Sequence, residues 1–504
     1  MGVMLATFME VLDTSIANIA LPHIAGSLSA TPEEATWVLT SYLVANAIVL
    51  PTTGWLANHF GRKRVFITCI VMFTLSSALC GLAWSLPTLI FARVLQGVGG
   101  GAMVPIAQSI MLESFPRQKR GAAMAIFAQG VVVAPILGPT LGGWITDSYS
   151  WRWIFYINLP VGIAAVLMAQ WLVEDPPYIQ RNKSATIDYI GFGLLAMWLA
   201  TLQILLDKGQ EADWFGAVWV RWFTLVSVLS FIAFIWWQLR AEHPLVDLSV
   251  FKNRNFTIGL ILMTTLGAIL YGTTAQIPLF LQTLMGYPAL QSGYAMSPRG
   301  IAACVTTFFV GRIVGKVRMR WMLCIGFTLL AASSFMLSNL NLQVSQMNVI
   351  WPSVVNGIAI SFIFVPLTTA TMSQLAQQQL GNATGLYNLM RNLGGSIGIA
   401  FVTTMLARGA QAHQALMVGQ LAPDNPAFRQ QLDSAKHLLV HHTDPVTASR
   451  QAYNAVYSLL DQQAHLWAFV DNFFIFGAMA LVTMPLIFLF KRVAAPAKTA
   501  PTGH

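Results

Sequence analysis

Two carboxylates, Glu10 and Asp13, stand one helical turn apart in an apolar run, within the segment MEVLDTSIANIALP (9–22). Residues three positions apart share one face of a helix, so both side chains project to the same side. A helix that begins near residue 3 carries Asp13 about 15 Å along its axis, which is near the middle of a bilayer if the run crosses one. A charged carboxylate at that depth costs about 2.5–3.5 kcal/mol, so other groups must offset this cost.

Carboxylates in such a place can bind and release protons. Burial and a neighbouring like charge favour the protonated carboxyl group, whereas a nearby guanidinium favours the carboxylate. Arg93, which lies in a later apolar run, is the best candidate for that guanidinium. We therefore expect Asp13 to be a proton carrier opposed by Arg93, with Glu10 tuning it or contacting cationic groups. A static buried ion pair is the alternative interpretation.

The composition places these residues in a membrane. The 504-residue chain is 56% hydrophobic and only 9% charged, whereas soluble domains are about 25% charged. The formal charge of +9 comes from short basic clusters between apolar runs, which is typical of loops beside a membrane and not of a nucleic-acid surface. We therefore expect an all-α polytopic membrane protein.

The sequence gives no sign of enzyme chemistry. The four cysteines lie inside apolar runs without metal-ligand spacing, so we expect no metal site. The chain contains no phosphate-binding loop, no cofactor motif and no hydrolase triad. We expect neither an enzyme nor a bound cofactor.

Apolar runs of about 20 residues, the length that spans a bilayer, recur along the whole chain. The expected transmembrane helices are 3–22, 36–57, 65–84, 87–111, 121–144, 153–173, 188–206, 217–238, 256–283, 292–312, 321–339, 349–371, 383–406 and 466–490.

Basic clusters orient these spans. GRKR (61–64), PRQKR (116–120) and GKVRMR (315–320) all fall on the side of the first residue. Because cytoplasmic loops carry the excess of Lys and Arg, both termini are predicted to be cytoplasmic. The longest polar segment, 407–465, then lies on the opposite side, and part of it can form an amphipathic helix on the membrane or on a partner.

A weak internal repeat divides the chain. GWLANHFGRKRVF (54–66) and GRIVGKVRMRWML (311–323) each leave a span at a glycine and enter the next span through a basic loop. Duplicated bundles are how many secondary transporters are built. We predict a six-helix bundle over 1–175, two inserted helices over 188–238, and a second six-helix bundle over 256–490 that contains the outer loop 407–465.

Polar, aromatic and charged residues inside the spans of both bundles are candidates for a substrate cavity. An ionisable residue inside a span usually has a functional role, which favours Arg299 and Arg391. Aromatic and amide side chains suit broad recognition of small molecules, although packing or lipid contact is the alternative for each. These candidates are Trp37, Asn46, Gln129, Tyr271, Gln276, Phe280, Tyr387 and Asn388.

Several motifs follow one another at the matching spans: LDTSIANIALP (12–22), GWLANHFGRKR (54–64), LIFARVLQGVGGG (89–101), APILGPTLGG (134–143) and WRWIFYINLPVG (151–162). With them the chain resembles the drug:proton antiporters of the major facilitator superfamily that have 14 transmembrane helices, and most closely the EmrB-type multidrug exporters. PLVDLSVFKNRNFTIG (244–259) and NLMRNLGGSIG (388–398) extend the resemblance over nearly the whole chain.

The resemblance implies a major facilitator fold and export of hydrophobic or amphipathic drugs across the bacterial inner membrane, driven by proton influx. It also implies an EmrA-like periplasmic adaptor, which 407–465 is placed to contact, and a TolC-like outer-membrane channel. A dedicated metabolite or siderophore exporter is one alternative. A membrane scaffold or sensor that does not transport is another, although two intact bundles argue against it.

The resemblance further implies gating elements. The family's loop motif usually has Asp where this chain has Asn58, so a charge latch at that position is not expected. A polar latch then depends on Gly61, Arg62, Glu113 and Arg117. The pairs Gly138–Pro139 and Gly142–Gly143 imply a kinked helix that seals or rocks the halves, with close packing alone as the alternative.

Overall fold

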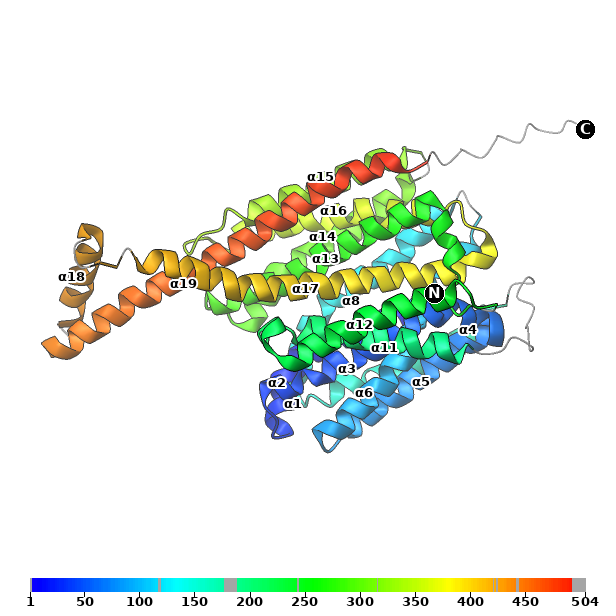
Figure 1. Ribbon diagram of the computed structural model, residues 1–504, viewed down its shortest axis with the longest axis horizontal. Coiled ribbons are helices and arrows are strands. Elements are labelled where there is room, and N and C mark those ends of the chain that lie inside the picture. The colour runs from blue at the N-terminus through cyan, green and yellow to red at the C-terminus, as the bar shows by residue number, and fades with distance from the viewer. Residues whose placement is uncertain are drawn as a thin grey trace, which may run out of the picture.

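The computed structural model describes residues 2–116, 119–175, 188–242, 244–314, 316–419, 421–422, 425–440 and 444–491. Long helices run side by side along one direction (Figure 1). They are α1 (Gly2–Ser27), α2 (Pro32–Ala35), α3 (Trp37–Val49), η1 (Leu50–Thr52), α4 (Thr53–Phe60), α5 (Arg62–Leu82), α6 (Leu86–Gly101), α7 (Met103–Ser114), α8 (Arg120–Ser148), α9 (Trp153–Tyr156), α10 (Asn158–Leu172), α11 (Tyr189–Lys208), η3 (Trp214–Gly216), α12 (Val218–Gln238), η4 (Leu248–Lys252), α13 (Arg254–Thr283), α14 (Ala289–Ile313), α15 (Met319–Leu337), α16 (Met347–Met372), η5 (Gln377–Gln379), α17 (Leu380–Val418), α18 (Pro426–Val440), α19 (Pro445–Thr483) and η6 (Met484–Leu489).

Eleven helical stretches among the described residues are long and apolar enough to cross a membrane. The other expected spans, 36–57, 121–144 and 292–312, coincide with α3–α4, α8 and α14. Large apolar side chains such as Leu75 and Trp222 are exposed on the helix surfaces, as contact with lipid requires. The all-α membrane fold is thereby confirmed, while the number of 14 crossings stays a prediction.

The two halves of the chain repeat one packing scheme. In the first half, α1 packs on α8 and α10, α3 packs on α6, and α5 packs on α6 and α10. In the second half, α13 packs on α17 and α19, α14 packs on α16, and α15 packs on α16 and α19. The similar segments 54–66 and 311–323 therefore leave corresponding helices, α4 and α14. The domain boundaries themselves stay a prediction.

The two halves meet at one end of the molecule, which we call the terminal end because α1 begins and η6 ends there; α18 marks the opposite, distal end (Figure 1). α8 packs along α14, and α17 packs on α4 and α7. Asn388 donates a hydrogen bond to Gln108 across this interface, with 2.6 Å between Nδ2 and Oε1. A Cβ atom on Gly311 would lie 2.4 Å from the Cβ of Ala125. The halves are therefore in close contact at the terminal end.

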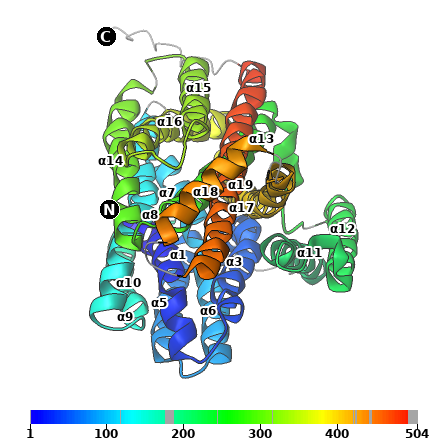
Figure 2. The ribbon, with the colours of Figure 1, turned by 90° about the vertical axis from the view of Figure 1, so that its left-hand side faces the viewer.

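α11 and α12 lie beside the two bundles (Figure 2). α11 contacts α3 of the first half and α17 of the second half, and α12 packs on α11. Gln203 on α11 donates a hydrogen bond to Ser396 on α17, with 2.8 Å between Nε2 and Oγ. Asp207 on α11 accepts a hydrogen bond from Thr40 on α3. The inserted helices are thus tied to both bundles.

The segment 407–465, which was expected to be a loop, is mostly helical. α17 continues to Val418, and α19 begins at Pro445 and runs unbroken into its apolar part. The predicted amphipathic helix is therefore the first part of α19, which extends the bundle at the distal end (Figure 1). The physical reason is a small apolar cluster that joins α18 to this extension, made of Phe428, Leu432, Ala452 and Val456.

Asp444 fixes the start of that extension. Its Oδ2 atom accepts a hydrogen bond from the backbone N–H of Thr447 at 3.0 Å. This bond holds the pKa of the exposed Asp444 carboxyl group below its ordinary value. Because the pKa is lower in the folded chain, the cap stabilises the helix above the ordinary carboxyl pKa and loses that effect as the pH falls through the folded value.

We predict that the packing of α1 on α8 depends on Gly138. A Cβ atom there would lie 2.2 Å from Ser15 Oγ, whereas nothing lies within 4 Å of one on Gly143. Gly138→Ala should therefore destabilise the protein by about 1–3 kcal/mol, because α1 must move away, and Gly143→Ala should have little effect. Thermal unfolding midpoints in detergent test this, and equal midpoints for the two variants would contradict it.

Candidate functional site

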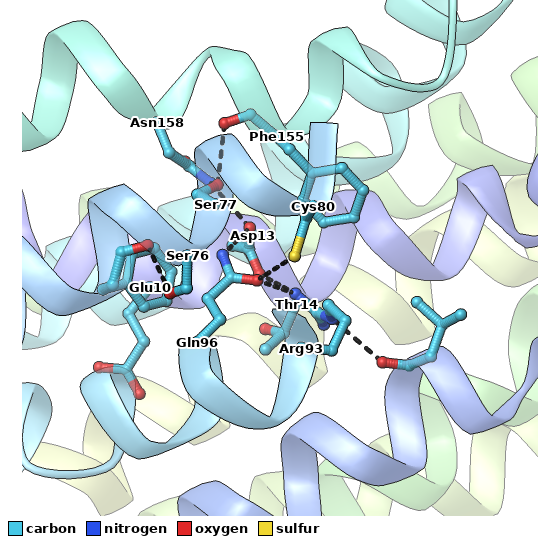
Figure 3. A network of polar contacts seen from close by, with 12 residues as sticks. Glu10, Asp13, Thr14, Ser76, Ser77, Cys80, Arg93, Gln96, Phe155 and Asn158 are labelled. Carbon is cyan, nitrogen blue, oxygen red and sulfur yellow. Dashed lines mark hydrogen bonds and ion pairs between the residues drawn. The ribbon is translucent and has the colours of Figure 1, made fainter. Parts of the chain in front are cut away.

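Asp13 lies at the centre of a buried polar network (Figure 3). Its Oδ2 atom is 2.6 Å from Nη1 of Arg93. Its Oδ1 atom accepts hydrogen bonds from Gln96 at 2.9 Å and from Asn158 at 2.7 Å. Both carboxylate oxygens are therefore satisfied, which is what a charge buried in a membrane protein needs.

Arg93 is fully buried and is held from several sides. Its Nε atom donates a hydrogen bond to the carbonyl oxygen of Val38 at 3.0 Å, and Nη1 donates one to Gln96 at 2.7 Å. Its guanidinium carbon lies 4.3 Å from the ring centroid of Tyr42, which adds a cation–π contact. The pairing of Arg93 with Asp13 that we expected is present, while its part in proton transfer stays a prediction.

The glycines of α6 explain how Arg93 reaches this position. A Cβ atom on Gly97 would lie 2.5 Å from the carbonyl oxygen of Tyr42, and one on Gly101 would lie 2.7 Å from Val49 Cβ. Without side chains at these positions, α6 lies directly on α3, as glycines allow in membrane helices. Arg93 stands one turn before this glycine run and so lies between α3 and α1.

Glu10 is also buried but has separate partners. Asn46 donates a hydrogen bond to its Oε1 atom at 3.1 Å, whereas Oε2 has no hydrogen-bond partner. Its carboxylate points away from the groups around Asp13 (Figure 3). Arg391, on α17 of the second half, lies within electrostatic range. One carboxylate of the predicted pair is therefore satisfied, and the other is only half satisfied.

Two predicted arginines of the second half are buried with open donors. Arg391 is 6% exposed, makes only long contacts of 3.4 Å to Asn392, and has no partner at Nη1. Arg299 is 7% exposed, donates from Nη1 to Thr274 at 3.0 Å, and has no partner at Nη2. The buried arginines Arg62 and Arg93 of the first half are thus paired with carboxylates, whereas no ion pair of Arg299 or Arg391 is present among the described residues.

Three other cavity candidates belong to the packing of the second half. Gln276 donates a hydrogen bond to the carbonyl oxygen of Phe469 at 2.8 Å, and the ring of Phe280 packs on the ring of the same residue. Tyr387 is fully buried and shares a hydrogen bond of 3.0 Å with Thr368. Each of these side chains therefore has a packing or hydrogen-bond partner within the second half, and a role in a substrate cavity stays a prediction.

The remaining candidates lie in different places. Asn46 contacts Glu10, and Asn388 joins the two halves. Gln129 and Tyr271 are half-buried on α8 and α13. Trp37 is exposed and lines a groove of about 430 Å³ between α3 and the inserted helices. Of the candidates in this paragraph, Asn46 is therefore the one that forms a hydrogen bond with Glu10.

The predicted latch contains a buried ion pair. Arg62 Nη1 lies 2.6 Å from Glu113 Oε2, and each side chain is 7% exposed. The pair joins α5 to α7 within the first half, so it does not itself bridge the two halves. Gly61 has a φ of 90°, a conformation that favours glycine at the turn between α4 and α5. Asn58 is exposed.

The other gating candidates concern α8. Gly138 and Gly142 pack against α1, whereas Gly143 faces open space. Arg117 and the side chain of Pro139 lie outside the described residues. The close-packing interpretation of Gly138 and Gly142 is therefore supported by geometry, and the rocking role stays a prediction.

Sequence reasoning did not single out three polar residues of the site and interface. Asn158 bonds to Asp13 and also donates to Ser77 Oγ at 3.0 Å, and Gln108 accepts from Asn388. Each is a polar side chain inside an apolar run, which is a usable signal. Spacing alone does not reveal which helix each one meets.

Two helical bundles of like packing, with buried charges between their helices, define a membrane transporter of the secondary type. The model of the Major Facilitator Superfamily matches residues 3–399, and the chain belongs to this family. It is 39% identical over 427 residues to the multidrug export protein EmrB of Escherichia coli K12, covering 84% of this chain and 82% of that protein.

A second relative matches almost from end to end. The fatty acid resistance protein FarB of Neisseria gonorrhoeae is 36% identical over 505 residues, covering 99% of this chain and 96% of that protein. The crystal structure of the human organic anion transporter MFSD10 superposes with a TM-score of 0.62, covering 96% of this chain and 98% of that one, at 13% identity. That structure supports the fold alone.

The resemblance to EmrB-type exporters is confirmed, and the protein is a multi-pass transporter related to multidrug exporters.

We predict that the buried pair at Asp13 couples the stability of its two members. Arg93→Met should destabilise the protein by about 3–5 kcal/mol, because it leaves the Asp13 carboxylate without its countercharge. The double variant Asp13→Asn/Arg93→Met should recover most of this loss, since neither charge remains. Unfolding midpoints of the single and double variants measure the coupling, and simply additive losses would contradict it.

Proposed function

We propose that the protein exports hydrophobic or amphipathic compounds across the bacterial inner membrane in exchange for protons, using the proton gradient and no bound cofactor. The observation that carries the proposal is the ion pair of Asp13 with Arg93, which is fully buried inside the first bundle. A buried ionisable pair in a membrane span usually serves transport or proton relay.

The network has two states that differ by one proton. While Asp13 is charged, it binds Arg93, Gln96 and Asn158. A proton on Asp13 removes the charge that holds Arg93, although Arg93 keeps its bonds to Val38 and Gln96. A substrate that binds one state better shifts the equilibrium between them, which is the requirement for coupling. Asp13 is the carrier in this proposal, and Arg93 is its countercharge.

Glu10 supports the recognition of substrate. Its Oε2 atom has no hydrogen-bond partner, and Asn46 holds the other oxygen. A cationic group on a substrate can pair with this open oxygen without disturbing the Asp13 network. Glu10 therefore either contacts cationic substrates or tunes the neighbouring carboxylate, as we expected from the sequence.

The proposed orientation places the terminal end, with both termini, in the cytoplasm. The halves are in contact at that end through α8–α14 and through Gln108–Asn388. This contact closes the proposed cytoplasmic side, and in the proposal protons reach the site from the opposite side. The membrane potential adds about 2.3 kcal/mol per charge per 100 mV to inward proton movement. Rocking at Gly138 and Gly142, with the Arg62–Glu113 pair keeping α5 on α7, would open the cytoplasmic side.

The end of α17, α18 and the start of α19 form a projection at the distal end (Figure 1). This distal projection is the proposed contact for an EmrA-like adaptor, which would connect the protein to a TolC-like outer-membrane channel. Exposed apolar side chains on this projection, including Leu416, Leu438 and Val446, support this role. The protein is therefore proposed as the pump of a tripartite efflux system.

A narrower exporter is the second candidate. The match to the fatty acid resistance protein covers 99% of the chain, more than the match to the E. coli multidrug exporter. A pump for one class of amphipathic compound would use the same proton site and differ only in its substrate cavity.

We predict that Asp13→Asn abolishes substrate-driven proton movement in proteoliposomes that contain a trapped pH dye. The amide cannot exchange a proton, so the two states of the network no longer differ. Asp147→Asn is the matched control, because Asp147 is 74% exposed and lies outside the network. Proton movement driven by ethidium should persist in the wild type and this control. Uphill transport by Asp13→Asn would refute the role of Asp13.

A further inference from the structure

Arg299 is a buried cation that lacks a buried anion. It lies within α14 at 7% exposure, and its Nη1 atom donates a hydrogen bond to Thr274 Oγ1 on α13. Its Nη2 atom has no hydrogen-bond partner. In the part of the chain that the structure describes, no carboxylate forms an ion pair with Arg299.

The two buried guanidiniums of Arg93 and Arg299 differ in how their charge is compensated. Arg93 is fully buried and also has no hydrogen-bond partner at Nη2, but Asp13 neutralises its charge and the Tyr42 ring covers it. A guanidinium at membrane depth with only one neutral hydrogen-bond partner is costly, because little there replaces the water it has lost. A second group must therefore compensate for that charge during the working cycle of the protein.

The surroundings of Arg299 also have unused hydrogen-bonding capacity. Gly357 on α16 packs against the backbone of Arg299, so α14 and α16 are in contact at this level. On the turn of α16 that precedes Gly357, the buried atoms Ser353 Oγ and Asn356 Oδ1 have no hydrogen-bond partner. Buried polar atoms are normally satisfied, so a group of unsatisfied ones indicates a place for a polar ligand or water.

We propose that Arg299 and Thr274 bind the carboxylate of an amphipathic anion, with the apolar chain of that molecule in the space between the bundles. This inference rests on the proposed export function and names a substrate class for it. Arginine fits the planar carboxylate because its fork of N–H donors can form two parallel hydrogen bonds. The anion belongs at Arg299 and not near α1, because the carboxylates Glu10 and Asp13 repel it there.

A matched set of ligands separates charge from apolar contact. Dodecanoate, dodecanol and dodecyltrimethylammonium share one chain and differ in the charge of the head group. Their binding is measured on protein in phosphatidylcholine nanodiscs, after subtraction of binding to empty nanodiscs. In the wild type, dodecanoate should bind more tightly than dodecanol. Arg299→Gln should weaken dodecanoate binding by about tenfold to hundredfold, because losing a hydrogen bond to a charged group changes the dissociation constant by about that factor.

Arg312→Gln is the matched control for this experiment. Arg312 lies on the same helix, but it is exposed and stacks on Phe308, with its guanidinium carbon 3.8 Å from the ring centroid. The Arg312→Gln variant should leave dodecanoate binding within twofold of the wild type.

The Arg299→Lys variant should restore part of the affinity for dodecanoate, because the charge returns without the planar fork. This partial rescue would show that an Arg299→Gln loss is not a folding defect.

Three results would overturn the inference. Equal losses of dodecanoate and dodecanol binding in Arg299→Gln would show a role in packing. Unchanged dodecanoate binding would show that the anion lies elsewhere. Displacement of dodecanoate by phosphatidylglycerol added to the nanodiscs would show that Arg299 holds a lipid phosphate and not a substrate carboxylate.

The export function is tested separately with the same variants. Proton movement driven by ethidium in proteoliposomes does not depend on a substrate anion. If the wild type moves no protons, but Arg299→Gln binds dodecanoate more weakly than the wild type does, the proposed antiport is refuted and the anion site is supported. If protons move and Arg299→Gln binds dodecanoate as tightly as the wild type, the proposed anion site is refuted and the proposed antiport is supported.

Discussion

A charged aspartate in the interior of a membrane helix must be paired, and the contact of Asp13 with Arg93 meets this requirement. The contact determines where the neighbouring helices can lie. α1 supplies the carboxylate, α6 supplies Arg93 and Gln96, α10 supplies Asn158, and α3 supplies the carbonyl oxygen of Val38. The glycines of α6 are what allow these helices to come close enough. The first bundle is therefore organised around one buried charge pair.

The contact between the halves is of a different kind. The strong polar contacts, Asp13–Arg93 and Arg62–Glu113, lie inside the first half. Between the halves, the described polar contact of Gln108 with Asn388 joins two neutral amides. A neutral hydrogen bond is worth about 0.5–1.5 kcal/mol, much less than the cost of breaking a buried ion pair. Under the proposed function, this difference would let each half move as a unit while its internal network stays intact, as alternating access requires.

Charge is also divided unevenly between the halves. The buried carboxylates Glu10 and Asp13 belong to the first half, and the open guanidiniums of Arg299 and Arg391 belong to the second half. A molecule with one charged group and an apolar body can therefore find a complementary surface on one side or the other. Under the proposed function, a cationic compound would pair with Glu10 and an anionic compound with Arg299.

Much of this arrangement could be predicted from the sequence. Apolar runs give the helices, because each must satisfy its own backbone in lipid. Arg93 was the expected partner of Asp13, because a buried carboxylate needs a buried cation. The helix extension over 407–465 was not expected, since contacts such as Phe428 with α19 connect residues distant in the chain. The separate orientations of Glu10 and Asp13 were also missed, because one shared face does not determine which neighbouring helix each side chain meets.

The most direct measurement is the number of protons released when substrate binds to the purified protein in weakly buffered detergent solution. We predict that ethidium binding releases protons from the wild type at acidic pH, where part of the substrate-free protein carries a proton on Asp13, because the bound state favours charged Asp13 paired with Arg93. Release should be absent in Asp13→Asn at saturating ethidium. Undiminished release from Asp13→Asn would contradict the account, because another group would then carry the proton.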